Sequence, residues 1–229
     1  MAKARPRHRV EPRQPPAPGS PGPAPRAAMR LNAREENERL ILEAGESVFA
    51  ELGFKGATTG AIAARAGLPK ANVHYYFPSK DDLYRAVMAR VLHRWLAAAS
   101  SLDDSDDPED ALTRYITAKM ELSRSMPLGS RIFASEIMRG APAIADHLEG
   151  TLAHWVETRG AIVRRWIAEG KLAPIEPKTL FFLIWAATQH YADFATQIEV
   201  LNGGRPLDDD EFAETTRQLA RTILRGVLA

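Results

Sequence analysis

Basic and aromatic side chains follow one another in the stretch GLPKANVHYYFPSK, residues 67–80, which holds a histidine, two tyrosines and a phenylalanine between two lysines. A segment this short cannot form a hydrophobic core of its own. Throughout residues 52–80 every charged side chain is basic, and these side chains are Lys55, Arg65, Lys70 and Lys80. Because no carboxylate in this span repels a phosphate, and the polar groups can hydrogen-bond to base edges, the residue types favour contact with nucleic acid.

Two short helices are expected to position these side chains. A pair of threonines can cap a helix near residues 59–66, and Gly67 supplies the left-handed residue of a turn. A proline suits the start of the next helix, near residues 69–76. The pattern predicts a helix-turn-helix, inside which Tyr76 and Phe77 are expected to pack.

Seven residues of this segment are candidate contacts to DNA. Early in the second helix, where a recognition helix presents side chains to base edges, stand Lys70, Ala71, Asn72 and His74. Asn72 is suited to adenine and Lys70 to guanine, and the small Ala71 allows close approach or contact with a thymine methyl group. The residues better placed to hold the sugar–phosphate backbone are Thr59, Tyr75 and Lys80.

The longer stretch GFKGATTGAIAARAGLPKANVHYYFPSKDDL, residues 53–83, resembles the DNA-binding head of the Tet repressor (TetR) family nearly position by position. The resemblance implies contacts to DNA from the same seven positions. Two residues depart from the family pattern, because Pro69 stands where the family often has serine and His74 where it often has tyrosine. Because of these two differences, the operator sequence cannot be inferred from the family pattern.

Capping motifs predict helices along the rest of the chain, and no stretch shows a convincing period of two. Asn32 with Glu35 and Ser79 with Asp82 read as helix starts, and Gly53 reads as a helix end. The expected helices lie near residues 33–52, 59–66, 69–76, 79–100, 109–125, 128–139, 143–169, 177–200 and 209–227. The fold class is therefore predicted to be all-α, with an N-terminal three-helix helix-turn-helix head and a larger C-terminal helical domain.

Three parts follow from this pattern. Residues 1–31 are expected to form a disordered, extended arm, since they are rich in proline and arginine and hold Glu11 as their one acidic residue. The arm either adds sequence-independent attraction to phosphates or merely solubilises the chain. Residues 32–78 are expected to form the helix-turn-helix DNA-binding domain, and residues 79–229 a ligand-binding and dimerisation domain.

A second resemblance covers roughly residues 115–200. The segments SRIFASEIMRGAP (130–142), GKLAPIEP (170–177) and IWAATQHYADFATQIE (184–199) resemble the pyrimidine-utilisation repressors of the TetR family. This resemblance implies that a free pyrimidine base, such as uracil or thymine, releases the protein from DNA. Ala134 stands where the subgroup pattern predicts a larger side chain, a difference that would reshape a pocket there.

The residues themselves point to a ligand site on the helix expected near 177–200. That helix is apolar nearly all round, yet it carries polar groups that must find partners if they are buried. Gln189 follows Trp185 by one turn on the same face, so a flat heterocycle could stack on the indole while the amide donates and accepts hydrogen bonds. The alternative is a capped core amide beside a packing tryptophan. Phe133 and Trp95 either complete this pocket or pack in the core.

A homodimer is expected through the last two helices. The final helix carries an apolar stripe, formed by Phe212, Thr216, Leu219, Ile223 and Val227, that one partner helix need not cover completely. The TetR resemblance implies that the last two helices form a four-helix bundle with their copies. Two heads about one DNA turn apart, ~34 Å, would read a pseudo-palindromic double-stranded operator.

Other classes of function are disfavoured. The chain has 229 residues and no cysteine, so disulfides and thiolate metal sites are excluded, and we expect no cofactor and no metal. No apolar run is long enough to span a bilayer, which favours a cytoplasmic protein without membrane contact. No nucleophile or phosphate-binding loop accompanies His190 and Asp193, which disfavours an enzyme. The alternatives left open are a regulator with an unrelated effector and an architectural DNA-binding protein that ignores ligands.

Overall fold

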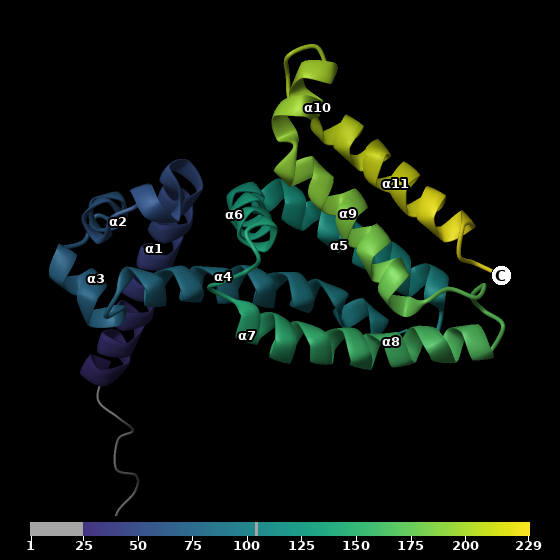
Figure 1. Cartoon of the computed structure of the whole chain (residues 1–229), viewed down its shortest axis with the longest axis horizontal. Helices are drawn as coiled ribbons and strands as arrows, with labels where there is room; N and C mark the ends of the chain where they lie inside the picture. Colours follow the sequence, from purple (N-terminus) through teal and green to yellow (C-terminus); the bar gives the residue numbers. More distant parts are fainter. Residues whose placement is uncertain (1–24, 104) are drawn as a thin grey trace, which may run out of the picture. The chain divides into compact units, whose positions relative to one another are not determined.

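The computed structural model describes residues 25–103 and 105–229, with side chains from Asn32 onward, and these residues are built of helices (Figure 1). An isolated β-bridge joins Leu172 to Leu228. The helices are α1 (Pro25–Gly56), α2 (Thr59–Ala66), α3 (Lys70–Tyr76), α4 (Lys80–Ala97), η1 (Ala98–Leu102), α5 (Pro108–Ser125), α6 (Pro127–Met138), α7 (Ala145–His147), η2 (Leu148–Leu152), α8 (Ala153–Ala168), α9 (Pro177–Asp193), α10 (Ala195–Leu201) and α11 (Asp209–Arg225). In the described part of the chain, none of these helices combines the length and apolar character that a bilayer crossing requires. The predicted all-α class is confirmed.

The start of α1 differs from the prediction. The helix begins at Pro25 rather than near residue 33, so Asn32 lies inside it and does not cap it. A proline fits the first turn of a helix, and the alanines, methionine and leucine that follow are good helix formers. The predicted arm, which was expected to end at residue 31, therefore includes the first residues of this helix. The chain divides after Glu36 into two units, and residues 1–24 lie outside the described part.

Within the unit that begins at Asn37, the first three helices form the predicted head. Gly53, with φ at 67°, breaks the helical backbone at the predicted end of the first helix. The Thr58 hydroxyl accepts a hydrogen bond from the Ala61 amide at 3.1 Å, and Gly67 adopts the left-handed conformation in the turn between α2 and α3. The head's core joins α1, α2, α3 and α4 through side chains that are almost fully buried, among them Ile41, Val48, Phe49, Ile62, Val73, Phe77 and Leu83.

Helix α4 runs from the head into the larger C-terminal part. A capping box between Ser79 and Asp82 starts it, as predicted. Its buried face repeats at helical spacing through Leu83, Val87, Val91 and Trp95. The first of these residues pack in the head and the last against α6, so one rigid helix belongs to both parts.

A second core lies between α5, α8, α9 and α11, where α5 packs along α9 (Figure 1). Two predicted helices are interrupted here. The one expected at 143–169 contains the π-helical turn η2, and the one expected at 177–200 breaks at Phe194, where φ is −116° and ψ is 30°. Neither break contains a proline, and the apolar residues continue through both of them. The sequence therefore carries no signal that these helices are interrupted.

Helix α6 approaches α4 and α1 so closely that glycine is required at one position. A Cβ atom built on Gly129 would lie 2.9 Å from Cγ2 of Val91 and 3.0 Å from Oε1 of Glu46. Val91 is branched and fully buried, so it cannot move aside cheaply. Pro127 stands in the first turn of α6, a position that suits proline.

We predict that Gly129→Ala lowers the free energy of unfolding by about 1–3 kcal/mol, because the added methyl group overpacks this contact. Urea denaturation measures the change. Gly150→Ala is the matched control, since a Cβ there meets no atom within 4 Å. An equal effect of both substitutions would contradict the close approach.

Candidate functional site

The first turns of α3 present an exposed surface. Lys70, Ala71, His74 and Tyr75 are exposed and Asn72 is half-buried, whereas Val73 is fully buried. Tyr75 is 72% exposed, and Phe77 is only 8% exposed. The exposure of Lys70, Ala71 and His74 and the burial of Phe77 agree with the prediction, whereas Asn72 and Tyr76 are only partly buried.

Thr59 lies beside this surface. Its hydroxyl oxygen is 3.4 Å from Nε2 of His74, so the start of α2 and the middle of α3 meet at a polar contact. Thr59 is only partly buried, and His74 is exposed. The structure therefore brings together two candidate DNA contacts that are 15 residues apart in the sequence.

Arg65 contributes less free positive charge than the sequence indicates. Its guanidinium forms a two-pronged ion pair with Glu51, with Nη1–Oε1 and Nη2–Oε2 distances of 2.8 Å, and it also bonds Ser47. The pKa of Glu51 is lowered chiefly by this hydrogen bond. Glu51 stands just before the carboxylate-free span, and the packing of α1 on α2 brings it to Arg65. Lys55 and Lys70 remain exposed.

Lys80 binds backbone carbonyl groups of its own chain. Its ammonium donates to the carbonyl oxygens of Phe54 at 2.8 Å and Ala57 at 3.0 Å, and it lies 4.4 Å from the centre of the Phe54 ring. These contacts hold the turn between α1 and α2. A DNA phosphate would have to use the third donor of the ammonium, so the predicted backbone contact stays a prediction.

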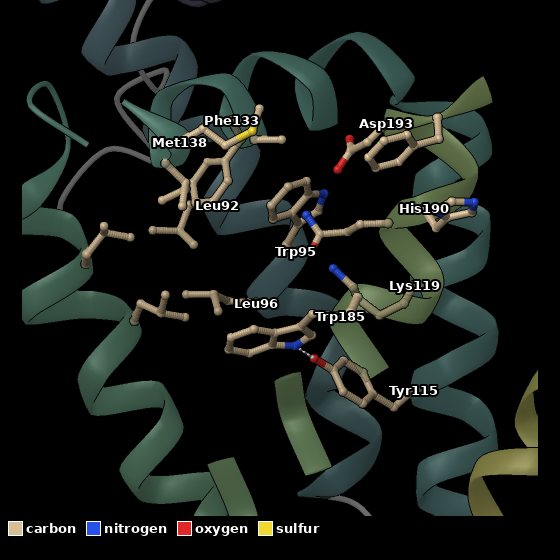
Figure 2. Close-up of a pocket in the computed structure, with 17 residues that line it drawn as sticks. Leu92, Trp95, Leu96, Tyr115, Lys119, Phe133, Met138, Trp185, His190 and Asp193 are labelled. Carbon is tan, nitrogen blue, oxygen red and sulfur yellow. Dashed lines mark hydrogen bonds between the residues drawn. The ribbon is translucent and has the colours of Figure 1, made fainter. Parts of the chain in front are cut away.

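A cavity of about 640 Å³ lies in the C-terminal part (Figure 2). All four predicted ligand residues are among those that line it. They are Trp95, Phe133, Trp185 and Gln189. Trp95 and Phe133 meet edge to face, with ring centres 4.8 Å apart, and are at least nine-tenths buried. They therefore pack in the core and form the wall of the cavity at the same time.

The indole of Trp185 is fixed in place. Its Nε1–H donates to the hydroxyl oxygen of Tyr115 at 2.7 Å, and its ring lies nearly parallel to that of Phe181. Burial raises the pKa of Tyr115, so this hydroxyl stays protonated. Gln189, one turn later, has no hydrogen bond to any residue that the structure describes. A capped core amide would have such a partner, so this geometry disfavours that alternative.

Lys119 is a residue of the cavity that the sequence analysis missed. It is 3% exposed, and its ammonium lies 4.5 Å from the centre of the Trp95 ring. Figure 2 shows the nitrogen pointing between the indoles of Trp95 and Trp185. The described residues offer it no hydrogen-bond acceptor. Its place among the buried residues of α5, one turn after Tyr115, was the signal available.

Asp193 is the acidic group of the same cavity. Ser130 donates a hydrogen bond of 2.6 Å to its carboxylate. Burial raises the pKa of Asp193, while this hydrogen bond and the charge of Lys119 oppose the increase. Burial lowers the pKa of Lys119 to about 7, and Asp193 opposes that change. A donor and an acceptor thus line a largely apolar space.

Helix α6 connects the cavity to the head. Phe133 and Ala134 line the cavity, whereas the carboxylate of Glu136 is 1% exposed and turns toward α4. It accepts hydrogen bonds from the Tyr84 hydroxyl at 3.0 Å, from Arg139 at 2.7 Å and from the Ala143 amide at 2.8 Å. Burial and the hydrogen bond to Glu136 raise the pKa of Tyr84 to about 12. The Tyr84 ring in turn packs on Phe49 and Phe54 of the head.

We predict that stability rises with pH because of Lys119. Its pKa is about 7 in the folded chain and 10.5 when unperturbed, so the unfolded chain binds more protons between these values. The free energy of unfolding therefore increases across this window, by at most about 1.4 kcal/mol per pH unit. Urea denaturation at pH 7, 8 and 9 should show a steeper rise for the wild type than for Lys119→Met. Parallel curves would contradict burial of a titrating amine.

Comparisons with known proteins agree with the two parts of the fold. The model of bacterial regulatory proteins of the tetR family matches residues 41–87, and that of the YcdC-like protein C-terminal region matches residues 88–229. The chain is similar to the HTH-type transcriptional regulator RutR of Escherichia coli strain K12, with 40% identity over 198 residues that cover 86% of this chain and 93% of that protein.

Two further proteins show how far the likeness extends. The HTH-type transcriptional repressor LfrR of Mycolicibacterium smegmatis is 37% identical over 96 residues, 42% of this chain and 50% of that protein. The solved structure of the ketosteroid transcriptional regulator KstR2 of Mycobacterium tuberculosis has a TM-score of 0.64, with 20% identity over 84% of this chain and 95% of that one, and it shows the fold alone. The chain belongs to the TetR family of DNA-binding transcriptional regulators, a non-enzymatic class, and carries a RutR-like, YcdC-type C-terminal region.

Proposed function

We propose that this regulator is a repressor that a small effector releases from a pseudo-palindromic operator, and that the effector is a pyrimidine base such as uracil or thymine. We place DNA binding in residues 32–78 and effector binding with dimerisation in residues 79–229. The observation that carries the proposal is the cavity, in which Lys119, Gln189 and Asp193 are polar groups on an otherwise mostly apolar wall. An architectural DNA-binding protein that ignores ligands would need no such space.

The hydrogen-bonding pattern of the cavity suits a pyrimidine. One edge of uracil presents an acceptor, a donor and an acceptor in order. Lys119 supplies donors, Asp193 supplies an acceptor, and the Gln189 amide supplies both. The indoles of Trp95 and Trp185 both line the cavity, and a flat ring could stack on Trp185 beside the Lys119 ammonium that lies over Trp95. This chemistry supports the effector class that the resemblance to pyrimidine-utilisation repressors implies.

The exposed face of α3 is the proposed reader of the operator. Asn72 and Lys70 would bond to base edges in the major groove, with Ala71 and His74 beside them. Thr59, Tyr75 and the free donor of Lys80 would contact the DNA backbone. The exposed Lys55 and Lys70 support attraction to phosphates, and the pairing of Arg65 with Glu51 reduces it.

Dimerisation is proposed through the last two helical regions, α9 with α10 and α11. The apolar stripe of α11 is largely covered within the chain, since Phe212 and Ile223 are buried. Exposed apolar surface is instead found on α9, where Phe182 is 57% and Leu183 is 46% exposed. Such side chains favour contact with a second copy.

We propose that α6 couples effector binding to release from DNA. An effector that contacts Phe133 and Ala134 favours one position of this helix. Because Glu136 is hydrogen-bonded to Tyr84, a shift of α6 also moves Tyr84 and thus the head. The head-to-head distance in the dimer then changes. The effector shifts this equilibrium only by its difference in affinity for the two states.

We predict that Asn72→Ala weakens binding to the operator by about 1–3 kcal/mol, because it removes a base-edge contact. Binding to unrelated DNA should change little, since that binding depends on phosphate contacts. Fluorescence anisotropy with both DNAs at one salt concentration measures the difference. Equal losses on the two DNAs would count against base reading by this residue.

We predict that Gln189→Leu keeps operator binding and loses release by uracil and thymine, because leucine fills the same space without hydrogen bonds. The measurement is operator binding with increasing concentrations of each base. Thr117→Leu is the control, because Thr117 is an exposed polar residue of α5 that neither lines the cavity nor belongs to the helices of the proposed dimer contact. A normal response of Gln189→Leu would place the effector site elsewhere.

A further inference from the structure

The cavity has more room than an unsubstituted base needs. Its volume is about 640 Å³. The eight non-hydrogen atoms of uracil take up about 240 Å³ at most, if each is given the ~30 Å³ share of a liquid water molecule. A base bound through its hydrogen-bonding edge would therefore leave more than half of the space to something else.

The remaining space is apolar. Figure 2 shows Leu92, Leu96 and Met138 on one side of the cavity and Lys119, His190 and Asp193 on the other. The π-helical turn η2 adds two more leucines to the lining. Ordered water gains little from such a wall, because it finds no hydrogen-bond partners there.

Ala134 leaves part of this space open. It lines the cavity from α6 and shares a helix face with Ile137 and Met138, three and four residues later. Met138 is 81% exposed and Phe194 is 55% exposed, so the cavity reaches the surface between apolar side chains. A ligand with an apolar arm can extend along this face and shield these side chains from water.

We infer that the effector is amphiphilic: a hydrogen-bonding ring held by Lys119, Gln189 and Asp193, with an alkyl or aryl substituent along Leu92, Leu96 and Met138. The polar and apolar sides of one cavity call for a molecule with two corresponding parts. An unsubstituted pyrimidine satisfies the polar side and still binds there, whereas a substituent on the same ring would also fill the apolar side. This inference rests on the proposed function, because it specifies the effector of the same site.

The test is calorimetric titration of the full chain with uracil, thymine, and uracils that carry propyl or hexyl groups at C5 or at C6. Each added methylene should tighten binding about three- to fourfold in at least one series, until the apolar side is filled. Hexanol, which lacks the ring, should bind far more weakly than hexyluracil. Tight uracil binding with no gain along either series would overturn the inference and leave the proposed function intact. A failure of every pyrimidine to bind would overturn both.

Two variants locate the two parts of the ligand. Ala134→Leu fills the apolar side, so it should weaken hexyluracil at least tenfold and leave uracil nearly unchanged. Lys119→Met removes the buried donor at similar volume, so it should weaken both ligands by the same factor. Equal loss of uracil and hexyluracil in Ala134→Leu would contradict an apolar arm along α6, and circular dichroism of each variant checks that it is folded.

Discussion

The buried carboxylate of Glu136 is the constraint on which the rest of the structure depends. At 1% exposure it is stable only because Tyr84, Arg139 and the Ala143 amide all donate to it. These bonds fix α6 against α4 at the level of the head. Since α6 also lines the cavity, a shift of this helix cannot leave the Tyr84 contact unchanged. The proposed link between ligand and DNA follows from that geometry.

Two polar side chains of the cavity lack a hydrogen-bond partner among the described residues. Lys119 places an amine in a largely apolar space, and in its protonated form the ring of Trp95 compensates the charge only in part. Asp193 is engaged by Ser130, and Trp185 by Tyr115, whereas Gln189 and Lys119 keep their hydrogen-bonding capacity. A folded chain tolerates such groups at a cost in stability, which a ligand with matching polar atoms recovers.

Local patterns in the sequence predicted most of the fold, because capping boxes, glycine turns and apolar periodicity act within one or two turns of a helix. The helix-turn-helix and the start of α4 at Ser79 are examples. Long-range packing was not predictable in this way, because no residue near Arg65 indicates its pairing with Glu51. Lys119 stands on the apolar face of α5, but only the packing of α5 shows that this face lines a cavity. Gln189, and with it Trp185, was found because a polar side chain on an almost wholly apolar helix is locally visible. Phe133 and Trp95 were named as aromatic residues that either complete the pocket or pack in the core.

The ion pair between Arg65 and Glu51 has a consequence for how the head meets DNA. A guanidinium already neutralised by a carboxylate displaces few condensed cations from a duplex. Lys80 keeps its charge because its two partners are carbonyl oxygens, so Lys55, Lys70 and Lys80 are the cations of residues 52–80 that no described carboxylate neutralises. We therefore expect Arg65 to add little to the salt dependence of DNA binding, whereas each of these three lysines can displace a condensed cation.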